Sequence, residues 1–566
     1  MGTIVRKIKK GKPYYYAVES KRVDGKPRIV WQKYLGTLDT IIQKCASSPK
    51  PEQGYEVDIF EAGGIAAMLQ IARKLRLIEI INENTPKRKQ GVSIGEYIVL
   101  AAINRVVAPC SKLQMPDWYQ KTVLYRLWKY SPDAFSSQAF WNNMDLISEE
   151  SLDIMQEQIV IQLKQVFGID PTMLLYDTTN FFTYVATGNH RNTIAKRGRN
   201  KQKRDDLRQV GLALLVSKDF QIPLFHKTYP GNIPDRGLFP TVSQELIAWK
   251  KKVLKSHQET TLIFDKGNVS DDGMSNLIAS NQKFVCGVPR TTDPEFFATK
   301  VDELLPVSGL AGTKAKSILI EIWNTKLKAV LAYSERYFSS EFVELTESIR
   351  KCQQQLQDLD KWLENGPKRE SDKKYYSLES VRSKVNSIRS TSYLKRVMKV
   401  DILTEKEIPR LEYAIDQKEI DVISQTCLGR TLLFSSYLEW SENEIIDAYR
   451  SQQNIEDAFK LMKNREYLHW HPAFHWTDQK IKVHSFYTVL ALLLATLAHR
   501  TAVTSGVDVT LLQLLDDLND IREVALIYPN DLSKNPKHKD GLALSRMSPK
   551  QKKLSEALEL QQILKI

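Results

Sequence analysis

The sequence predicts an α/β protein of several domains, built around a mixed β-sheet. Its 566 residues exceed what one hydrophobic core usually serves. Between residues 170 and 290, apolar strand-like runs alternate with helical patterns in the order strand, hairpin, helix, strand, helix, strand. Two of the strand-like runs share one ending, "LLYD" and "LIFD", which places Asp177 and Asp265 after buried apolar residues. A single Asp there could simply begin a turn, but two suggest that the carboxylates meet.

Composition limits the class of protein. A hydrophobic content of 42% and a charged content of 26% are those of a globular chain. The formal net charge of +14 favours a polyanionic partner and by itself leaves nucleic acid, ribosome and membrane surface open. The five cysteines are scattered without a C-x-x-C pair, so we expect neither a disulfide framework nor a thiolate zinc site. The longest apolar run, 486–498, is about thirteen residues, which predicts a buried helix and no membrane span.

The patterning divides the chain into six segments. The first is a small basic β unit with a linker, in which Asp24-Gly25 marks a hairpin turn; a solvated edge hairpin and a DNA-contacting arm are equally good interpretations. A helical segment follows, interpreted as a domain that binds DNA ends or as a packing domain. The remaining segments are the two parts of an α/β core, an insertion of strands and a helical hairpin between them, and a helical tail that could serve dimerisation. The boundaries are 1–54, 55–168, 169–290, 291–428, 429–500 and 501–566.

A third carboxylate lies on a predicted helix over 441–464. Ser441 and Glu444 form a capping box at its start. At 100° per residue, one narrow stripe carries Glu456 and four polar companions beside the apolar face. The companions are Tyr449, Gln452, Lys460 and Lys463. From the residues alone, Glu456 could be an ordinary boundary residue paired with lysine.

Several motifs together resemble the DDE transposases of bacterial insertion sequences, in the IS-four-like superfamily. "YRSQQNIEDAFKLMK" is similar to the family's Y-x2-R-x3-E-x6-K signature, with Gln452 in place of Arg. "YDTTNFF" and "FDKGN" resemble the motifs of the first and second Asp. Each motif is weak alone, but their order and contexts are specific. The resemblance implies an RNase H-like mixed-sheet core with a large insertion, in which the catalytic, metal-binding acids Asp177, Asp265 and Glu456 converge.

The resemblance also implies an activity. Such an enzyme cleaves DNA at the ends of its element and transfers the strand, using two Mg²⁺ ions for which Mn²⁺ substitutes. Tyr449, Gln452, Lys460 and Lys463 would contact DNA, although the change from Arg puts the contact of Gln452 in doubt. The resemblance further implies that the partner is double-stranded DNA, at element ends and at targets, and that the protein is a homodimer on it. It also implies a cytoplasmic, nucleoid-associated location without membrane contact. An RNase H-like nuclease or resolvase without strand transfer, and a catalytically silent DNA-binding regulator, are the alternatives.

Two further residue clusters are a basic loop and a group of histidines. The loop 189–209 is the densest basic segment and follows the first-Asp strand, so we favour contact with the DNA backbone over a merely solvated charge run. Its predicted contacts are Lys196, Arg197, Arg199, Lys201, Lys203 and Arg204. The histidines His469, His471 and His475 fit no standard zinc spacing, and we expect a packed turn there.

Overall fold

A computed structural model of the protein describes residues 2–9, 12–23, 26–46, 56–87, 91–169, 172–186, 188–200, 204–253, 259–367, 369–405, 408–471, 474–527 and 541–565. The chain divides into two compact units. One draws on Met1–Phe60 and Arg522–Arg546, and the other on Glu61–Ile521 and Met547–Lys565. Several predicted features lie outside the described residues: the centre of the linker, residues 47–55, the turn Asp24-Gly25, and Lys201 and Lys203 of the basic loop.

The first unit holds two small three-stranded sheets. One has the order β1 (Gly2–Lys9), β2 (Lys12–Val23), β3 (Lys26–Gly36), followed by helix α1 (Leu38–Ala46). The other has the order β17 (Gly541–Leu544), β16 (Arg522–Ile527), β4 (Glu56–Glu61). The predicted β unit is therefore present, but the tail from 501 onward is not helical throughout. In "REVALI" apolar and polar residues partly alternate, and its pairing with β4 and β17 overrides the helical pattern around it.

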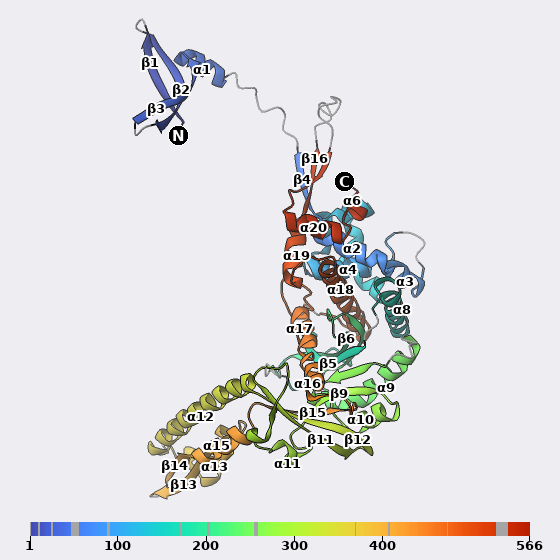
Figure 1. The fold of residues 1–566 in the computed structure, drawn as a ribbon, viewed down its shortest axis with the longest axis vertical. Coiled ribbons are helices and arrows are strands. Elements are labelled where there is room, and N and C mark those ends of the chain that lie inside the picture. The colour runs from blue at the N-terminus through green and yellow to red at the C-terminus, as the bar shows by residue number, and fades with distance from the viewer. Residues whose placement is uncertain are drawn as a thin grey trace. The chain divides into compact units, whose positions relative to one another are not determined.

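A nine-stranded sheet organises the second unit (Figure 1). Its first five strands are β5 (Met173–Thr183), β6 (Arg208–Ser217), β7 (Pro223–Pro230), β8 (Thr261–Phe264) and β9 (Lys283–Val288). They lie in the order β7-β6-β5-β8-β9, antiparallel among the first three and parallel from β5 to β9. Helix α9 (Asp235–Val253) connects β7 to β8, and α10 (Asp271–Ala279) connects β8 to β9. This order and these directions are those of an RNase H-like core.

Four more strands extend the same sheet beyond β9. β15 (Arg430–Ser435) pairs antiparallel with β9, and β12 (Thr325–Ser334), β11 (Thr313–Ile322) and the short β10 (Leu305–Pro306) follow outward. Because β15 pairs with both β9 and β12, the sheet runs on without a break across the boundary predicted at 290/291. The sequence pattern identified β11 and β12 as strands but could not show which sheet they join.

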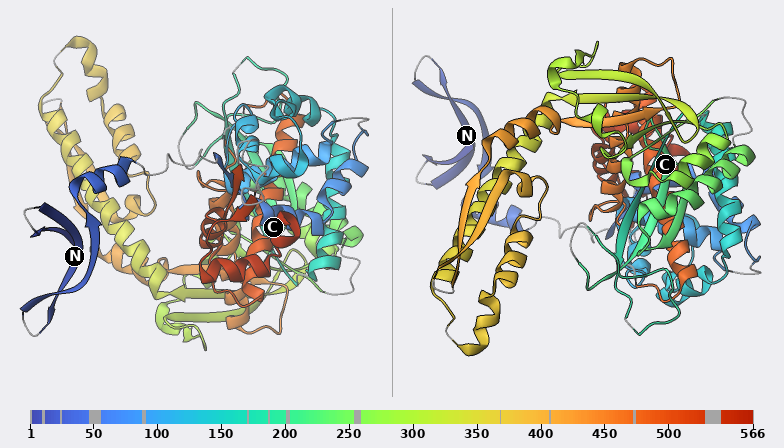
Figure 2. Two further views of the ribbon diagram at one scale, coloured as in Figure 1. Left: turned by 90° about the horizontal axis from the view of Figure 1, so that it is seen from above. Right: turned by 90° about the horizontal axis from the view of Figure 1, so that it is seen from below.

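Between β12 and β15 the chain forms a lobe with its own core. It contains α12 (Glu335–Glu364), α13 (Leu378–Ile388), α14 (Leu394–Val397), α15 (Gln417–Thr426) and the hairpin β13 (Met398–Glu405)–β14 (Ile408–Ile415). α12 places Leu345, Ile349, Cys352, Leu356, Leu359 and Leu363 along one face, at spacings of three and four residues. This face packs on Val381 and Val385 of α13. The two helices lie side by side in the lobe (Figure 2). The predicted helical hairpin is present, whereas the sequence analysis missed the β-hairpin.

We expect limited digestion with a protease of broad specificity to cut this lobe first at 366–374, a strongly polar connection between α12 and α13. The fragments should stay associated, because α12 and α13 share one apolar core. Gel electrophoresis of the digest, with size-exclusion chromatography of the nicked protein, measures both outcomes. Early cleavage within 172–182 or 261–268 would contradict this expectation, because those segments belong to the central sheet.

The helical segments before and after the sheet form one body. α2 (Gly63–Lys74), α4 (Ile94–Val107), α7 (Ser137–Met144) and α8 (Glu149–Phe167) pack on α18 (Asp478–Thr504). Shorter helices complete it: α3 (Leu77–Glu83), α5 (Met115–Gln120), α6 (Val123–Trp128), α19 (Leu511–Asn519), α20 (Pro549–Ala557) and α21 (Gln561–Leu564). Among the described residues, α18 alone has the length and apolarity of a membrane span, but 94% of that window is buried in the protein. α18 is therefore a core helix, which also contacts β7.

Candidate active site

Asp177 and Asp265 follow equivalent residues of two adjacent parallel strands. The parallel pairing of β5 with β8 ends with Tyr176 opposite Phe264. Asp177 is the next residue within β5, whereas Asp265 is the first residue after the end of β8. Adjacent strands are about 4.8 Å apart, so the two acids are direct neighbours. Asp177 does not end its strand, however. β5 continues to Thr183 because β6 keeps pairing with it, with Leu214 opposite Asp177.

Glu456 is brought to β5 by a helix that is interrupted just before it. The predicted single helix over 441–464 is two helices, α16 (Glu442–Arg450) and α17 (Gln453–Met462), separated at Ser451 and Gln452. The side chain of Gln452 is only 7% exposed, and its Nε2 donates to the backbone oxygen of Tyr176 at 2.9 Å. Gln452 thus ties the start of α17 to the residue before Asp177. Glu456, one turn later, lies on the same face of the chain.

The three acids share one electrostatic environment. The pKa of the Asp177 carboxyl rises to about 7, first because burial disfavours its charged form, then because Asp265, Asp235 and Glu456 add negative charge nearby. Asp265 and Glu456 also line a common cavity of about 280 Å³. Burial and neighbouring negative charge therefore both oppose ionisation of Asp177.

Tyr449 is held by Asp265. Its hydroxyl donates to Oδ1 of Asp265 at 2.6 Å. Burial, and then the charge of Asp265, raise the pKa of Tyr449, so the hydroxyl keeps its proton and acts as a donor. The contact needs Gly287 of β9, since a Cβ there would lie 2.5 Å from the Tyr449 hydroxyl. In this structure Tyr449 orients a site carboxylate, while the predicted DNA contact stays a prediction.

Lys460, within α17, and Lys463, directly after it, have different surroundings. Lys463 Nζ donates to Thr179 Oγ1 at 2.6 Å and lies 5.4 Å from the ring centre of Phe181. Thr179 is two residues after Asp177, hence on the same face of β5, so Lys463 brings positive charge beside Asp177. Lys460 is exposed and pairs with Asp457 at 2.8 Å.

Asp235 is a fourth acid that the sequence analysis missed. It is the first residue of α9 and accepts a hydrogen bond from the Tyr229 hydroxyl at 3.4 Å. Asp235 also lies near Gly267, two residues after Asp265: a Cβ added to Gly267 would be 4.0 Å from Oδ2 of Asp235. In the sequence, Asp235 stands at a helix start after "GNIP". Asp is common at helix starts, so this position did not indicate a residue of the site.

The described part of the basic loop is anchored to α18. The Asp478 carboxylate accepts from the backbone N–H groups of Thr193 and Ile194. Lys196 exchanges backbone hydrogen bonds with Gln209, and Arg204 pairs with Asp206 at 2.8 Å. Arg197 and Arg199 lie in the same segment. The loop is therefore attached at both sides of its basic cluster.

The predicted metal ligands and the histidines can be compared with the geometry that an ion needs. In the described ranges, no three His, Cys, Asp or Glu side chains are grouped closely enough to hold an ion as they lie. This includes Asp177, Asp265 and Glu456, and it includes the histidines. The ring of His475 hydrogen-bonds that of His484 at 2.8 Å, and the His469 and His471 rings are 5.4 Å apart. Burial lowers the pKa of both His475 and His484, as in a packed turn.

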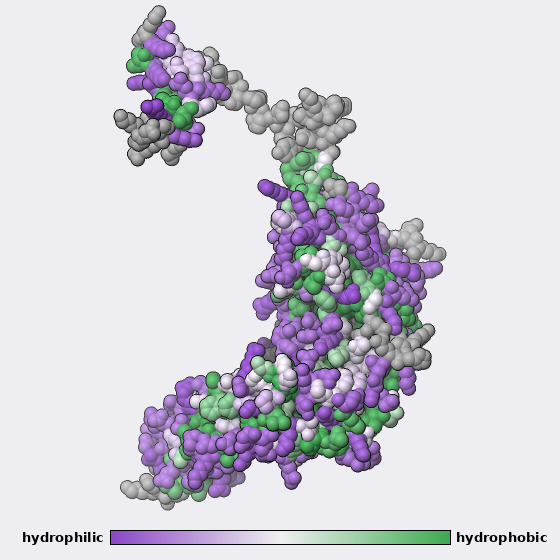
Figure 3. All heavy atoms as spheres, in the orientation of Figure 1, coloured by the Kyte–Doolittle hydropathy of each residue, from purple (hydrophilic) through white to green (hydrophobic). Residues whose placement is uncertain are grey.

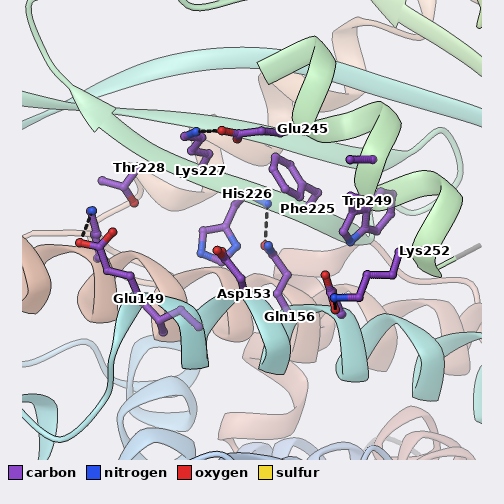
Figure 4. A pocket seen from close by; sticks show the side chains of 14 residues that line it. Glu149, Asp153, Gln156, Phe225, His226, Lys227, Thr228, Glu245, Trp249 and Lys252 are labelled. Atoms are coloured by element: carbon purple, nitrogen blue, oxygen red, sulfur yellow. Dashed lines mark hydrogen bonds and ion pairs between the residues drawn. The ribbon is translucent and has the colours of Figure 1, made fainter. Parts of the chain in front are cut away.

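A separate cavity of about 370 Å³ lies between α8, β7 and α9 (Figure 4). Gln156 accepts from the backbone N–H of His226 there, at 2.7 Å. Lysines and glutamates on its walls are paired, for example Lys252 with Glu157 at 2.6 Å. None of the predicted site residues lines this cavity.

Comparisons with known proteins give a weak structural likeness. No protein-family model matches the chain, and no curated protein matches it. Among solved structures, a piggyBac transposase synaptic complex with hairpin DNA aligns with a TM-score of 0.34 and 9% identity, over 82% of each chain. A likeness at this level carries no argument about activity, so the site residues must supply it.

The amide of Gln452 offers a test of this geometry. Gln452→Ala removes the donor to a buried backbone oxygen, and we expect it to lower the free energy of unfolding by about 1–3 kcal/mol. The neighbouring Gln453→Ala is the matched control, because that side chain is exposed and should change the value by less than about 0.5 kcal/mol. Urea unfolding measures both; equal effects would show that Gln452 does not tie α17 to β5.

Proposed function

We propose that the protein is a DNA transposase that cleaves DNA at the ends of its own element and transfers the strand. The observation that carries this is the placement of Asp177 within β5 and of Asp265 directly after β8, on neighbouring parallel strands of an RNase H-like sheet. The helix carrying Glu456 packs on one of those strands. A carboxyl whose pKa is raised by burial and by neighbouring acids, as that of Asp177 is, is a feature of functional centres.

The donor chemistry of the site fits Mg²⁺. All three proposed ligands, Asp177, Asp265 and Glu456, offer carboxylate oxygens, which Mg²⁺ prefers, and Mn²⁺ accepts the same set. The raised pKa of Asp177 supports the fit, because burial is its first cause and a divalent cation would offset the second, the negative charge of the neighbouring acids. When bound, two such ions supply an activated water and stabilise the leaving 3′ oxygen. Because Asp177, Asp265 and Glu456 are not grouped closely enough to hold an ion as they lie, the proposal requires their side chains to rotate toward one another.

The chain's own residues then have distinct roles. Tyr449 holds Asp265 in place through its hydroxyl and keeps its own proton. Lys463, beside Asp177, places a cation where a phosphate would approach. Gln452 serves as an internal tie, which accounts for a neutral amide at a position where the family signature has Arg.

The proposed substrate is double-stranded DNA, at element ends and at targets. A net charge of +14 and the basic loop favour a polyanion over a membrane surface. We include in the proposal a homodimer on DNA, because two ends must be held together, and a cytoplasmic, nucleoid-associated location.

A joining assay tests the function. The purified protein is incubated with Mg²⁺, a labelled duplex carrying the DNA that flanks the reading frame, and a supercoiled target plasmid. The proposal expects cut ends and label joined to plasmid. Cut ends without joined product would favour a nuclease or resolvase, and binding without any cut would favour a regulator.

A further inference from the structure

The N-terminal sheet concentrates the protein's positive charge. Residues 1–46 contain eleven Lys and Arg against three Asp and Glu, a net +8 of the chain's +14. These residues form the sheet β1-β2-β3 and helix α1. More than half of the net charge therefore lies in less than a tenth of the chain.

The two faces of this sheet differ. Strand pairing places Ile4, Arg6 and Ile8 on the same face as their partners Ala17, Tyr15 and Pro13. Lys33 and Trp31 join that face opposite Ala17 and Glu19. We call Ile4, Arg6, Ile8, Tyr15, Trp31 and Lys33 the open face.

Apolar side chains are exposed on the open face, and the other face has both an exposed ring, Tyr34, and a buried side chain, Val18. Ile4 is 62% exposed, Ile8 65% and Trp31 51%. Val18, which points the other way, is 3% exposed, and α1 packs against β2 and β3. A shallow hollow of about 240 Å³ lies between Ile4, Ala17 and Trp31. Apolar and hydrophilic side chains are accordingly mixed on the surface of this unit (Figure 3).

We propose that the open face binds duplex DNA in its major groove. This proposal rests on the proposed function and deepens it, because it names a DNA-binding surface in addition to the carboxylate site. Three strands about 4.8 Å apart span about 10 Å, and the major groove is about 12 Å wide. Sheets are known to enter that groove.

The chemistry of the open face suits this partner. Arg6 and Lys33 can neutralise phosphates or donate to guanine edges, while Ile4, Ile8 and Trp31 offer apolar contacts to thymine methyl groups. A purely apolar face would instead suit a protein partner, and a purely basic one would lack the apolar contacts to thymine methyl groups. A-form RNA is a poor fit, since its major groove is too narrow for a sheet.

Charge reversal on opposite faces of the same strand tests the proposal in the full-length protein. The test variant carries Arg6→Glu and Lys33→Glu. The matched control carries Lys7→Glu and Lys9→Glu, which change the net charge equally but lie on the other face of β1. Trp31→Ala is a third variant that alters no charge. Circular dichroism and thermal melting check that each variant folds.

Binding is measured by fluorescence anisotropy with a labelled 40-base-pair duplex of the flanking DNA, across a range of salt concentrations. The test variant should bind at least about tenfold more weakly, with a slope of log affinity against log salt flatter by about 2. The control should lose at most about threefold. Trp31→Ala should weaken binding with the salt slope unchanged.

Equal losses in the test and control variants would overturn the proposal, because only overall charge would then matter. Tighter binding of the same sequence as single strands or as duplex RNA would also overturn it. The joining assay separates this outcome from the proposed function. If the face variants bind normally while the parent cuts DNA, only this inference fails. If the parent never cuts but the face variants lose binding, only the catalytic proposal fails.

Discussion

Asp177→Asn is expected to abolish DNA strand cleavage while leaving DNA binding intact. The same result is expected for Asp265→Asn and Glu456→Gln. Each change keeps the size of the side chain but removes the charge that a divalent cation needs, and we expect a rate loss of at least about a hundredfold. The measurement is cleavage of labelled flanking duplex in Mg²⁺, with binding followed in parallel by anisotropy.

Asp457→Asn is the matched control for these variants. Asp457 is adjacent to Glu456 but pairs with Lys460 at 2.8 Å, outside the set of three acids. It should cut at close to the parent rate. If Asp177→Asn also cuts at close to the parent rate, the carboxylates are not a metal site, and Asp177 is only a tolerated polar residue within β5.

Asp177→Asn should also stabilise the metal-free protein, and more so at high pH. The pKa of Asp177 is about 7 in the folded protein against an ordinary value of 3.8. The folded state therefore binds its proton more tightly, so this group lowers the free energy of unfolding progressively from about pH 4 to pH 7, and fully above that. At 1.36 kcal/mol per unit, the upper limit is about 4 kcal/mol at pH 8.

Thermal melting at pH 4.5 and pH 8, with and without Mg²⁺, measures this effect. Without Mg²⁺, the gain of Asp177→Asn over the parent should be small at pH 4.5 and several times larger at pH 8. Mg²⁺ should raise the Tm of the parent at pH 8, because binding to the folded state alone stabilises it. The variant should respond less, and Asp457→Asn should respond as the parent does. A gain independent of pH would contradict the repulsion inferred at Asp177.

Local patterns in the sequence were sufficient for the central strands. The strand candidates around "LLYD", "GLALLVS" and "LIFD" are present as β5, β6 and β8. Their apolar runs are buried, and period and length identify such strands without any knowledge of partners. The capping box at Ser441 and Glu444 is likewise present, because it involves residues only three apart.

Features that depend on distant partners could not be derived in this way. The extent of β5 past Asp177 depends on β6, and the place of β11 and β12 in the central sheet depends on β15. The break between α16 and α17 follows no Gly or Pro; it coincides with a hydrogen bond from Gln452 to a strand 276 residues away. Helical periodicity sees only neighbours within a turn or two.

For the candidate site, the sequence by itself determined which residue types are available: two aspartates after similar apolar runs, and a glutamate beside an apolar helical stripe. Only the tertiary structure decided that the two aspartates are neighbours on parallel strands, that Tyr449 is held by Asp265, and that Asp235 adds a fourth charge. The reason is physical. Strand and helix patterns are set by short-range sterics and burial, whereas register, burial and carboxylate repulsion depend on which distant segments pack together.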